Sequence, residues 1–480
     1  MTEFIEQRRT STQRKQVSPV DPLACASCLY YRKTLSNMNR SLVFLLLFCL
    51  VSFPLAAEEN WPQFRGQGSL GVSSNKNLPA VWSETKNVAW KRDLPGRGWS
   101  SPVVWGDRIF LTTVTREGQP EDAKRGLYFG GNRAKPPTVV HRRKVVCLST
   151  STGKVLWERV AHEAIPKYGH HIKSSYASET PVTDGERLYV YFGNVGVFCY
   201  TTGGKPLWSK RLKPHKMRYD WGTASSPVLH KGRLYLVNDN DEESYLLALD
   251  AKTGKEIWRT GRKEKSNWAT PYVWPNTLRT EIIVPGSGKI RSYDLDGKLL
   301  YELGGGSSIT IATPYSKFGL LYVSSGYILD RKKPLFAIRP GASGDISLKS
   351  DETSNKHIAW CQKRAGPYNP TTLVYGELLY VLLDRGMIAC YEAKTGREVY
   401  GRQRIDGGRA FTASPWAYDG KIFCLNEYGQ TFVIQAGRKF KLLSTNALAK
   451  DDLCMSTPAI AGDKLIIRTA GRVYCIKTSL

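Results

Sequence analysis

The chain has 480 residues, of which 41% are hydrophobic and 23% charged, and this composition excludes a disordered chain and a protein with several membrane spans. Its 43 glycines and 25 prolines, together with 25 tyrosines and 13 tryptophans, favour many short strands joined by turns over long helices. The 69 Lys and Arg residues outnumber the 42 Asp and Glu residues, and the net charge of +27 favours an anionic partner or surface without naming it.

The first feature along the chain is an apolar run. Leu42–Val51 is a stretch of ten apolar residues that follows Arg40 and precedes the small residues Ala56 and Ala57. A basic start, a short apolar centre and small residues at the end are typical of a secretory signal peptide. Ten residues span only about 15 Å as a helix, which is half of the hydrocarbon core of a bilayer. The pattern therefore predicts a signal peptide and no transmembrane segment in the mature chain.

This signal sets the predicted domain boundaries. Residues 38–57 are the signal peptide, and residues 1–37 are either an over-extended gene start or a disordered extension. Residues 58–86 form an N-terminal segment, and residues 87–480 form the folded domain. We expect the mature protein to be periplasmic or secreted.

A repeat runs through the rest of the chain. Each unit starts with a short strand after a proline, continues through a glycine turn into an apolar strand, and ends with two further strands. Most units follow one another at 43 to 46 residues, and two insertions lengthen the others. This period is typical of one four-stranded blade of a β-propeller. The anchor positions of the eight units are Pro102, Pro181, Pro227, Pro271, Pro314, Thr372, Pro415 and Pro458.

A turn and an aromatic residue recur late in the units. The turn has the form Asp/Ala-x-Thr-Gly-Lys, and the aromatic residue follows its glycine by four positions. A large aromatic side chain on the outer strand can wedge between neighbouring blades and bury apolar area there. The seventh unit departs from the pattern with Lys441. The aromatic positions are Trp157, Trp208, Trp258, Tyr301 and Tyr400.

The two ends of the folded domain complement each other. The last unit stops at Leu480 where its outer strand should begin, and Asn87–Leu94, with Trp90, has the composition of an outer strand. Pairing this strand with the last unit closes the ring and leaves no free inner edge. The predicted fold is thus all-β: an eight-bladed β-propeller of four-stranded antiparallel blades, closed by an N-terminal strand.

The repeated Thr-Gly-Lys-x-x-Trp pattern resembles that of the pyrroloquinoline-quinone (PQQ)-like β-propeller superfamily, over about residues 61–480. Trp61-Pro-Gln-Phe-Arg-Gly66 is similar to the start of a secreted branch of PQQ-like repeat proteins. The resemblance implies one of two roles. Quinoprotein dehydrogenases oxidise alcohols or sugars with PQQ and Ca²⁺, whereas outer-membrane assembly factors bind partner proteins without a cofactor.

The residues that the dehydrogenase branch requires are mostly missing. That branch often holds PQQ against two adjacent cysteines, and this chain has no adjacent cysteines and no Cys-x-x-Cys-His haem motif. The candidate calcium ligands are scattered and belong to no common motif. They are Asn194, Asn240, Asp384 and Glu427.

The segments that lead into the innermost strands carry the candidate ligand site. In a propeller these segments gather at one end of the central channel, where aromatic and basic side chains can hold a flat or anionic ligand. The alternative is an aromatic plug that braces the blades. The candidate residues are Trp99, His171, Lys173, Trp221, Trp268, Tyr368 and Arg409.

Other features suggest no further chemistry. His170 and His171 are adjacent, so on a strand they point to opposite faces, and no metal site is expected. Seven cysteines follow the signal segment, and an odd number favours structural thiols over a disulfide framework. The basic insertion 116–144 either docks an anionic polymer or a partner protein, or is a solvated loop that covers a blade. The insertion Gly341–Lys356 is expected to be a surface loop.

The sequence is compatible with two functions. The first is a binding or scaffold module at the cell envelope that holds a protein or an anionic polysaccharide, without catalysis and without a cofactor. The second is a PQQ-dependent oxidoreductase, in which PQQ and Ca²⁺ would be the cofactors. No catalytic residue can be named, and nucleic acid is not an expected partner of an exported protein.

Overall fold

The computed structural model describes residues 60–119, 122, 124–126 and 135–478. The expected signal peptide and the segment that precedes it lie outside the described residues. Helix in the described part is confined to two short 3-10 turns, η2 (Gln67–Ser69) and η3 (Arg218–Asp220). None of the helices in this part is long and apolar enough to cross a membrane.

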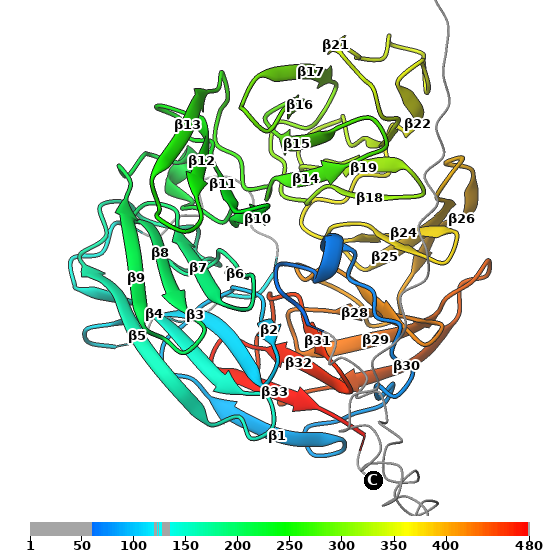
Figure 1. The fold of residues 1–480 in the computed structure, drawn as a ribbon. Coiled ribbons are helices and arrows are strands. Elements are labelled where there is room, and N and C mark those ends of the chain that lie inside the picture. The colour runs from blue at the N-terminus through cyan, green and yellow to red at the C-terminus, as the bar shows by residue number, and fades with distance from the viewer. Residues whose placement is uncertain (1–59, 120–121, 123, 127–134, 479–480) are drawn as a thin grey trace, which may run out of the picture. The chain divides into compact units, whose positions relative to one another are not determined.

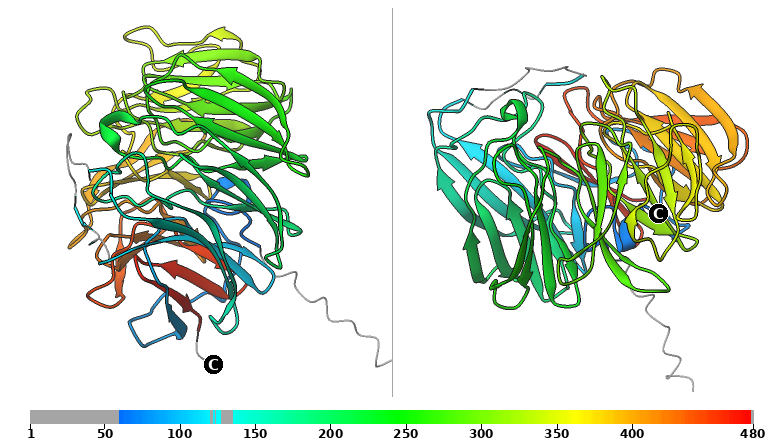
Figure 2. Two further views of the ribbon diagram at one scale, coloured as in Figure 1. Left: turned by 90° about the vertical axis from the view of Figure 1, so that its left-hand side faces the viewer. Right: turned by 90° about the horizontal axis from the view of Figure 1, so that it is seen from above.

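Eight antiparallel sheets form the unit that begins at Glu58, and Figures 1 and 2 show them side by side around a ring. This confirms the predicted eight-bladed propeller. Blade 1 consists of β2 (Val103–Trp105), β3 (Arg108–Arg116), β4 (His141–Ser149) and β5 (Val155–Ala164), and blade 2 of β6 (Val182–Thr183), β7 (Arg187–Phe192), β8 (Gly196–Thr201) and β9 (Pro206–Arg211). Blade 3 consists of β10 (Val228–His230), β11 (Arg233–Asn238), β12 (Tyr245–Asp250) and β13 (Glu256–Gly261), and blade 4 of β14 (Tyr272–Pro275), β15 (Thr280–Pro285), β16 (Lys289–Tyr293) and β17 (Leu299–Gly304). Blade 5 consists of β18 (Tyr315–Lys317), β19 (Leu320–Ser324), β20 (Leu335–Ile338) and β22 (Ile358–Gln362), and blade 6 of β23 (Leu373–Tyr375), β24 (Leu378–Leu383), β25 (Met387–Glu392) and β26 (Glu398–Arg404). Blade 7 consists of β27 (Trp416–Tyr418), β28 (Lys421–Leu425), β29 (Gln430–Gln435) and β30 (Leu442–Ala447), and blade 8 of β31 (Ala459–Ala461), β32 (Lys464–Arg468), β33 (Arg472–Ile476) and β1 (Val88–Asp93).

The ring closes where the sequence predicted. Strand β1 is the outer strand of the blade formed by β31, β32 and β33, and Trp90 lies opposite Cys475 in the β1–β33 pair. The final blade is therefore built from both ends of the folded domain (Figure 1).

One blade departs from the expected four strands. The insertion Gly341–Lys356 contains β21 (Gly344–Asp345), which pairs in parallel with the outer strand β17 of blade 4. The insertion is therefore not only a surface loop, because part of it extends this sheet to five strands.

Tryptophans on the outer strands join neighbouring blades, as the sequence predicted. The Trp157 indole Nε1 donates to the Thr202 carbonyl at 3.0 Å, and the Trp208 Nε1 donates to the Ala251 carbonyl at 3.1 Å. Trp90 and Trp258 make the equivalent bonds at 2.9 and 3.0 Å. The Trp360 Nε1 of blade 5 donates to the Ala393 carbonyl in the same way. The sequence did not predict this residue, because the insertion before it changes the spacing of the repeat.

A second inter-blade link lies at the residue just before six of the eight anchors. Its backbone N–H donates to the Ser or Thr hydroxyl at the same position of the next blade, at 2.9 to 3.0 Å. These bonds join strands that are 43 to 79 residues apart in sequence. The repeated hydroxyl therefore belongs to the construction of the ring. The residues linked in this way are Ser101, Thr180, Ser226 and Thr270 in one series and Thr313, Thr371, Ser414 and Thr457 in another.

The N-terminal segment is held inside the ring by Arg65. This side chain is fully buried, and burial lowers its pKa to about 10. Its guanidinium donates only to backbone carbonyls, so the charge is solvated by peptide dipoles from the segment itself and from the start of blades 6 and 7. The accepting carbonyls belong to Ser69, Leu70, Thr371, Thr372 and Pro415.

The seven described cysteines are all free and buried, which confirms that they are structural thiols. Burial raises the pKa of the Cys147 and Cys199 thiols to about 12. Each of these two residues lies opposite the outer-strand tryptophan of its blade, so a small apolar side chain is needed there.

Candidate functional site

Six of the seven candidate residues line one cavity of about 240 Å³. They come from the segments that precede the innermost strands of different blades, which is why residues so distant in sequence meet here. Arg409 is the exception: it is exposed, and its guanidinium lies over the Tyr428 ring at 4.4 Å. The six residues, which together we call the channel mouth, are Trp99, His171, Lys173, Trp221, Trp268 and Tyr368.

Hydrogen bonds between blades hold two of the tryptophans in place. The Trp99 Nε1 donates to the Lys173 carbonyl at 2.8 Å, and the Trp268 Nε1 donates to the Gly222 carbonyl at 2.7 Å. Trp221 packs between the His171 and Trp268 rings, with centroids at 5.1 and 5.7 Å. Its own Nε1 is buried and has no hydrogen-bond partner among the described residues. The mouth therefore offers fixed aromatic faces.

The lysine of the mouth is already neutralised. The Lys173 Nζ lies 2.5 Å from Glu427 Oε1, and the Glu427 side chain is fully buried. The same carboxylate accepts from Thr412 Oγ1 at 2.6 Å and from the Gly126 N–H at 2.7 Å. A buried ion pair of this kind satisfies both charges internally. The Lys173 ammonium is consequently committed to the protein.

The other titratable groups at the mouth are also held in neutral or internally bonded states. Burial, with the proximity of Lys173 and His170, lowers the pKa of His171 to about 4, so this imidazole is neutral at pH 7. Burial raises the pKa of Asp384, whose carboxylate accepts the backbone N–H groups of Tyr368 and Asn369 at 3.1 and 2.9 Å. The mouth is thus an aromatic surface with little free charge.

These residues do not fit PQQ and Ca²⁺. Within the described part of the chain, no group of three or more His, Cys, Asp and Glu side chains could hold a metal ion. The scattered candidates have separate roles. Asn240 closes a turn of blade 3 through Glu242 and Glu243, Asn194 accepts from the His215 N–H, and Glu427 is paired with lysine. An anionic quinone would find no unpaired ammonium at the mouth.

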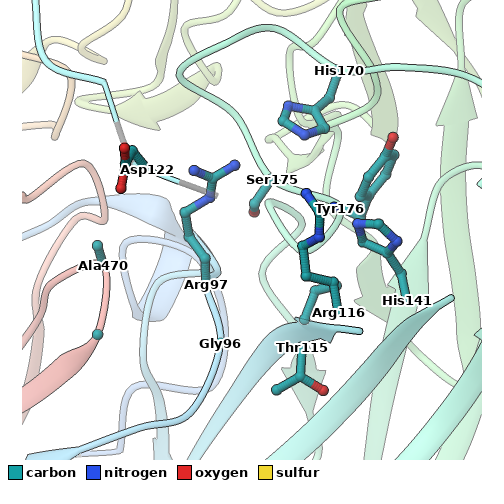
Figure 3. Close-up of a pocket in the computed structure, with 12 residues that line it drawn as sticks. Gly96, Arg97, Thr115, Arg116, Asp122, His141, His170, Ser175, Tyr176 and Ala470 are labelled. Carbon is teal, nitrogen blue, oxygen red and sulfur yellow. The ribbon is translucent and has the colours of Figure 1, made fainter. Parts of the chain in front are cut away.

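A larger cavity, of about 400 Å³, lies at the base of the basic insertion (Figure 3). Arg116 at the end of β3 and His141 at the start of β4 line it, with Arg97 and His170 from neighbouring segments. Tyr176 packs edge-on against the His141 and His170 rings at 5.2 and 4.8 Å. The sequence singled out the basic residues of 116–144 but not this cavity, because Arg97 and His170 come from elsewhere in the chain.

The described part of the insertion contacts segments that belong to distant blades. Arg125 donates to the Asp452 and Lys450 carbonyls at 2.7 and 3.2 Å, and Gly126 bonds to Glu427. The insertion therefore contacts blades 7 and 8, which is compatible with a loop that covers a blade. Whether it docks a polymer or a partner stays a prediction.

The chain belongs to the PQQ-like repeat β-propellers: residues 141–401, more than half of its length, match the PQQ_2 family, described as outer membrane protein assembly factor BamB. A curated relative is a polyvinylalcohol dehydrogenase from Pseudomonas sp, 22% identical over 285 residues. The match covers 55% of this chain and 36% of that enzyme, so the chain spans about a third of the relative's length.

Solved structures share the fold at low identity. The quinohemoprotein alcohol dehydrogenase ADHIIG from Pseudomonas putida HK5 is 11% identical, with a TM-score of 0.53, over 88% of this chain and 81% of that chain. The computationally designed protein Ika8 is 13% identical, with a TM-score of 0.50, over 75% of this chain and 98% of that chain. These likenesses concern the fold alone.

Proposed function

We propose that this protein is a non-catalytic binding module of the cell envelope that contacts its partner through the channel mouth. The observation that carries the proposal is the chemistry of the channel mouth. It has fixed aromatic faces, the His171 imidazole is neutral, and the Lys173 ammonium is paired with Glu427. Such a surface stacks on rings or apolar side chains and offers no paired acid and base for a reaction. The family match to an outer membrane assembly factor supports the same role.

The proposed partner is a protein or a polysaccharide of the envelope. Aromatic faces pack on sugar rings and on aromatic or aliphatic side chains. The net charge of +27 would bring an anionic polysaccharide to the surface. The apolar run Leu42–Val51, which lies outside the described residues, supports export to the periplasm or beyond.

The proposal is tested by photo-crosslinking in the native cell. A photoreactive residue at Ala224, in the lining of the mouth, should give a defined adduct. Trp268→Ala should weaken the adduct by about tenfold, or about 1.4 kcal/mol, because it removes one aromatic face. Arg409→Ala is the matched control, since Arg409 does not line the cavity, and it should leave the adduct unchanged. An adduct that ignores Trp268→Ala would contradict the placement.

The similarity to a polyvinylalcohol dehydrogenase favours PQQ-dependent oxidation as the second candidate function. It is separated from the first by titrating the purified protein with PQQ and Ca²⁺ and assaying dye-linked oxidation of alcohols and sugars. We expect no quinone-dependent change in absorbance or melting temperature and no turnover. Reproducible quinone-dependent turnover would overturn the binding-module proposal.

A further inference from the structure

The buried arginines of the described chain differ in how their charge is balanced. Arg65 and Arg468 donate to backbone carbonyls, and Arg262 forms a two-bond pair with Asp239 at 2.8 and 3.0 Å. Arg291 bonds to Glu302. Arg143 on β4 is only 4% exposed, yet within the described residues its guanidinium makes no hydrogen bond and no ion pair within 4 Å. Buried charges ordinarily have a hydrogen-bond or ion-pair partner, and Arg143 has none among the described residues.

The immediate surroundings of Arg143 compensate its charge only in part. Its guanidinium lies over the Tyr176 ring at 5.1 Å, a cation–π contact that supplies weak compensation. The Glu179 carboxylate acts on Arg143 electrostatically, but it is buried and already accepts from Thr223 Oγ1 at 2.5 Å and from the Gly193 N–H at 3.0 Å. Burial lowers the pKa of Arg143 to about 10, so the group remains charged at neutral pH.

Arg143 faces a cavity of about 260 Å³ between blades 1 and 2. Arg211 at the end of β9, His162 on β5 and Lys167 in the following segment line the same cavity. The described lining residues include no Asp or Glu, whereas the buried cations Lys173, Arg262 and Arg291 are each paired with a carboxylate. The remaining walls are apolar or aromatic, with the amide of Asn194 between them. The apolar and aromatic residues are Ile165, Pro166, Tyr168, Tyr176, Val195, Leu212 and Pro214.

We propose that this cavity binds an oxyanion, a carboxylate or phosphate group carried on a small organic body. The Arg143 and Arg211 guanidinium groups can meet the oxyanion with forked hydrogen bonds, which is the geometry that carboxylates and phosphates prefer. The Tyr168 and proline walls fit the body of the ligand, such as a sugar ring. The cavity is larger than an inorganic ion needs, which favours a ligand with such a body.

His162 is poised to report on this ligand. Its Nδ1 lies 2.8 Å from the Arg211 Nη1 and accepts from it, so the neutral ring carries its proton on Nε2 and can donate there. Burial and the charges of Arg211 on β9 and Arg143 on β4 lower the pKa of His162 to about 4. The ammonium of Lys167 lines the same cavity, and the neighbouring Glu163 is paired with Arg142. A bound oxyanion would oppose these cations and raise the pKa of His162.

The experiment is calorimetric titration of the full chain at low ionic strength with inorganic phosphate, glucuronate and the uncharged methyl glucoside. We expect saturable one-site binding of phosphate or glucuronate and none of the glucoside. Phosphate without glucuronate would identify a phosphate group, and glucuronate without phosphate would identify a carboxylate on a ring. Equal binding of glucuronate and the glucoside, or no saturable binding of either anion at millimolar concentration, would overturn the proposal.

Three variants separate this cavity from general basicity. Arg211→Gln removes an exposed lining cation and should weaken binding by about tenfold. Lys213→Gln is the matched control, because Lys213 is two residues away and exposed but does not line the cavity, and its binding should stay within about twofold. Arg143→Gln should abolish binding. If Arg143→Gln does not fold, the proposal is tested by Arg211→Gln alone, through the expected tenfold weakening of binding.

Nuclear magnetic resonance of the histidines provides the second readout. The pKa of His162 should rise from about 4 when phosphate or glucuronate saturates the wild-type protein. Because Arg211→Gln itself removes a charge that lowers this pKa, the variant is compared with its own ligand-free state, and the same ligand concentration should shift its pKa much less. Binding that is unchanged by Arg211→Gln, together with an unmoved His162, would place the anion elsewhere and refute the site.

Discussion

The contact between Gly254 and Trp208 gives the sharpest test of how the blades are joined. Gly254 lies in a Thr-Gly-Lys turn at φ +72°, and a Cβ added to it would lie 2.5 Å from the Trp208 ring of the preceding blade. Gly232, in the same blade, has φ +75° and open space where its Cβ would be. Gly254→Ala and Gly232→Ala therefore impose the same backbone strain, and only the first displaces the tryptophan.

The expected magnitudes follow from these contacts. An alanine in the left-handed region costs about 1–2 kcal/mol, partly offset by about 0.4–1 kcal/mol from the stiffer unfolded chain, and both variants share this difference. Displacing the Trp208 ring also loses its 3.1 Å hydrogen bond to the Ala251 carbonyl, at about 1 kcal/mol, and part of its packing, at about 1–2 kcal/mol. Gly254→Ala should therefore destabilise the fold by about 2–3 kcal/mol more than Gly232→Ala.

The assay is urea denaturation of both variants and of the wild type, followed by tryptophan fluorescence. The free energy of unfolding should fall clearly more in Gly254→Ala, and the native emission of that variant should shift because Trp208 moves. Equal losses in the two variants would mean that the glycine is needed only for its backbone conformation, and the argument for inter-blade contact would fail.

Three further outcomes are expected in the same denaturation assay. Arg65→Met should cost at least about 3 kcal/mol, because it leaves buried carbonyls unpaired, whereas the exposed Arg92→Met should change stability by about 0.5 kcal/mol or less. Glu427→Gln should cost about 3–5 kcal/mol because it leaves the Lys173 ammonium buried and unpaired, and adding Lys173→Met should recover part of the loss. Because the folded state lowers the pKa of His171 from about 6.5 to about 4, the unfolded chain takes up the proton first. Its contribution to stability should be complete above about pH 6.5 and decline as the pH falls toward 4, and His171→Asn should flatten that decline; an unchanged profile would refute this assignment.

The ring itself was predictable because its contacts repeat. A tryptophan on one blade packs on the turn glycine of the next, so the spacing of Gly204 and Trp208 along one unit encodes contacts on both of its sides. The same regularity identified β1 as the closing strand through Trp90. The repeat failed to reveal Trp360 because the insertion Gly341–Lys356 changes the spacing before it, although Gly396 packs on this ring as the rule requires.

The charge balance of the candidate sites was less accessible. Lys173 and Glu427 are 254 residues apart, and no local pattern says that one neutralises the other. The sequence therefore assigned Lys173 to an anionic ligand, whereas the structure commits it to a carboxylate. Arg409 was grouped with the mouth by its place before an innermost strand, but its side chain turns to Tyr428. Position along a repeat predicts where a backbone lies, and side-chain direction depends on neighbours that are distant in sequence.

The division between repeated and unrepeated residues also indicates where partners can bind. The outer tryptophans, the turn glycines that pack on them and the hydroxyl before six of the eight anchors make bonds or contacts between blades, so the ring uses them. Burial without a partner does not by itself mark a binding site, because the Tyr301 and Tyr400 hydroxyls of the repeated aromatic position are also buried without a hydrogen-bond partner among the described residues. Arg143 differs from these groups because its side chain lines a cavity together with two other cations, and this combination is the reason why we propose a ligand there.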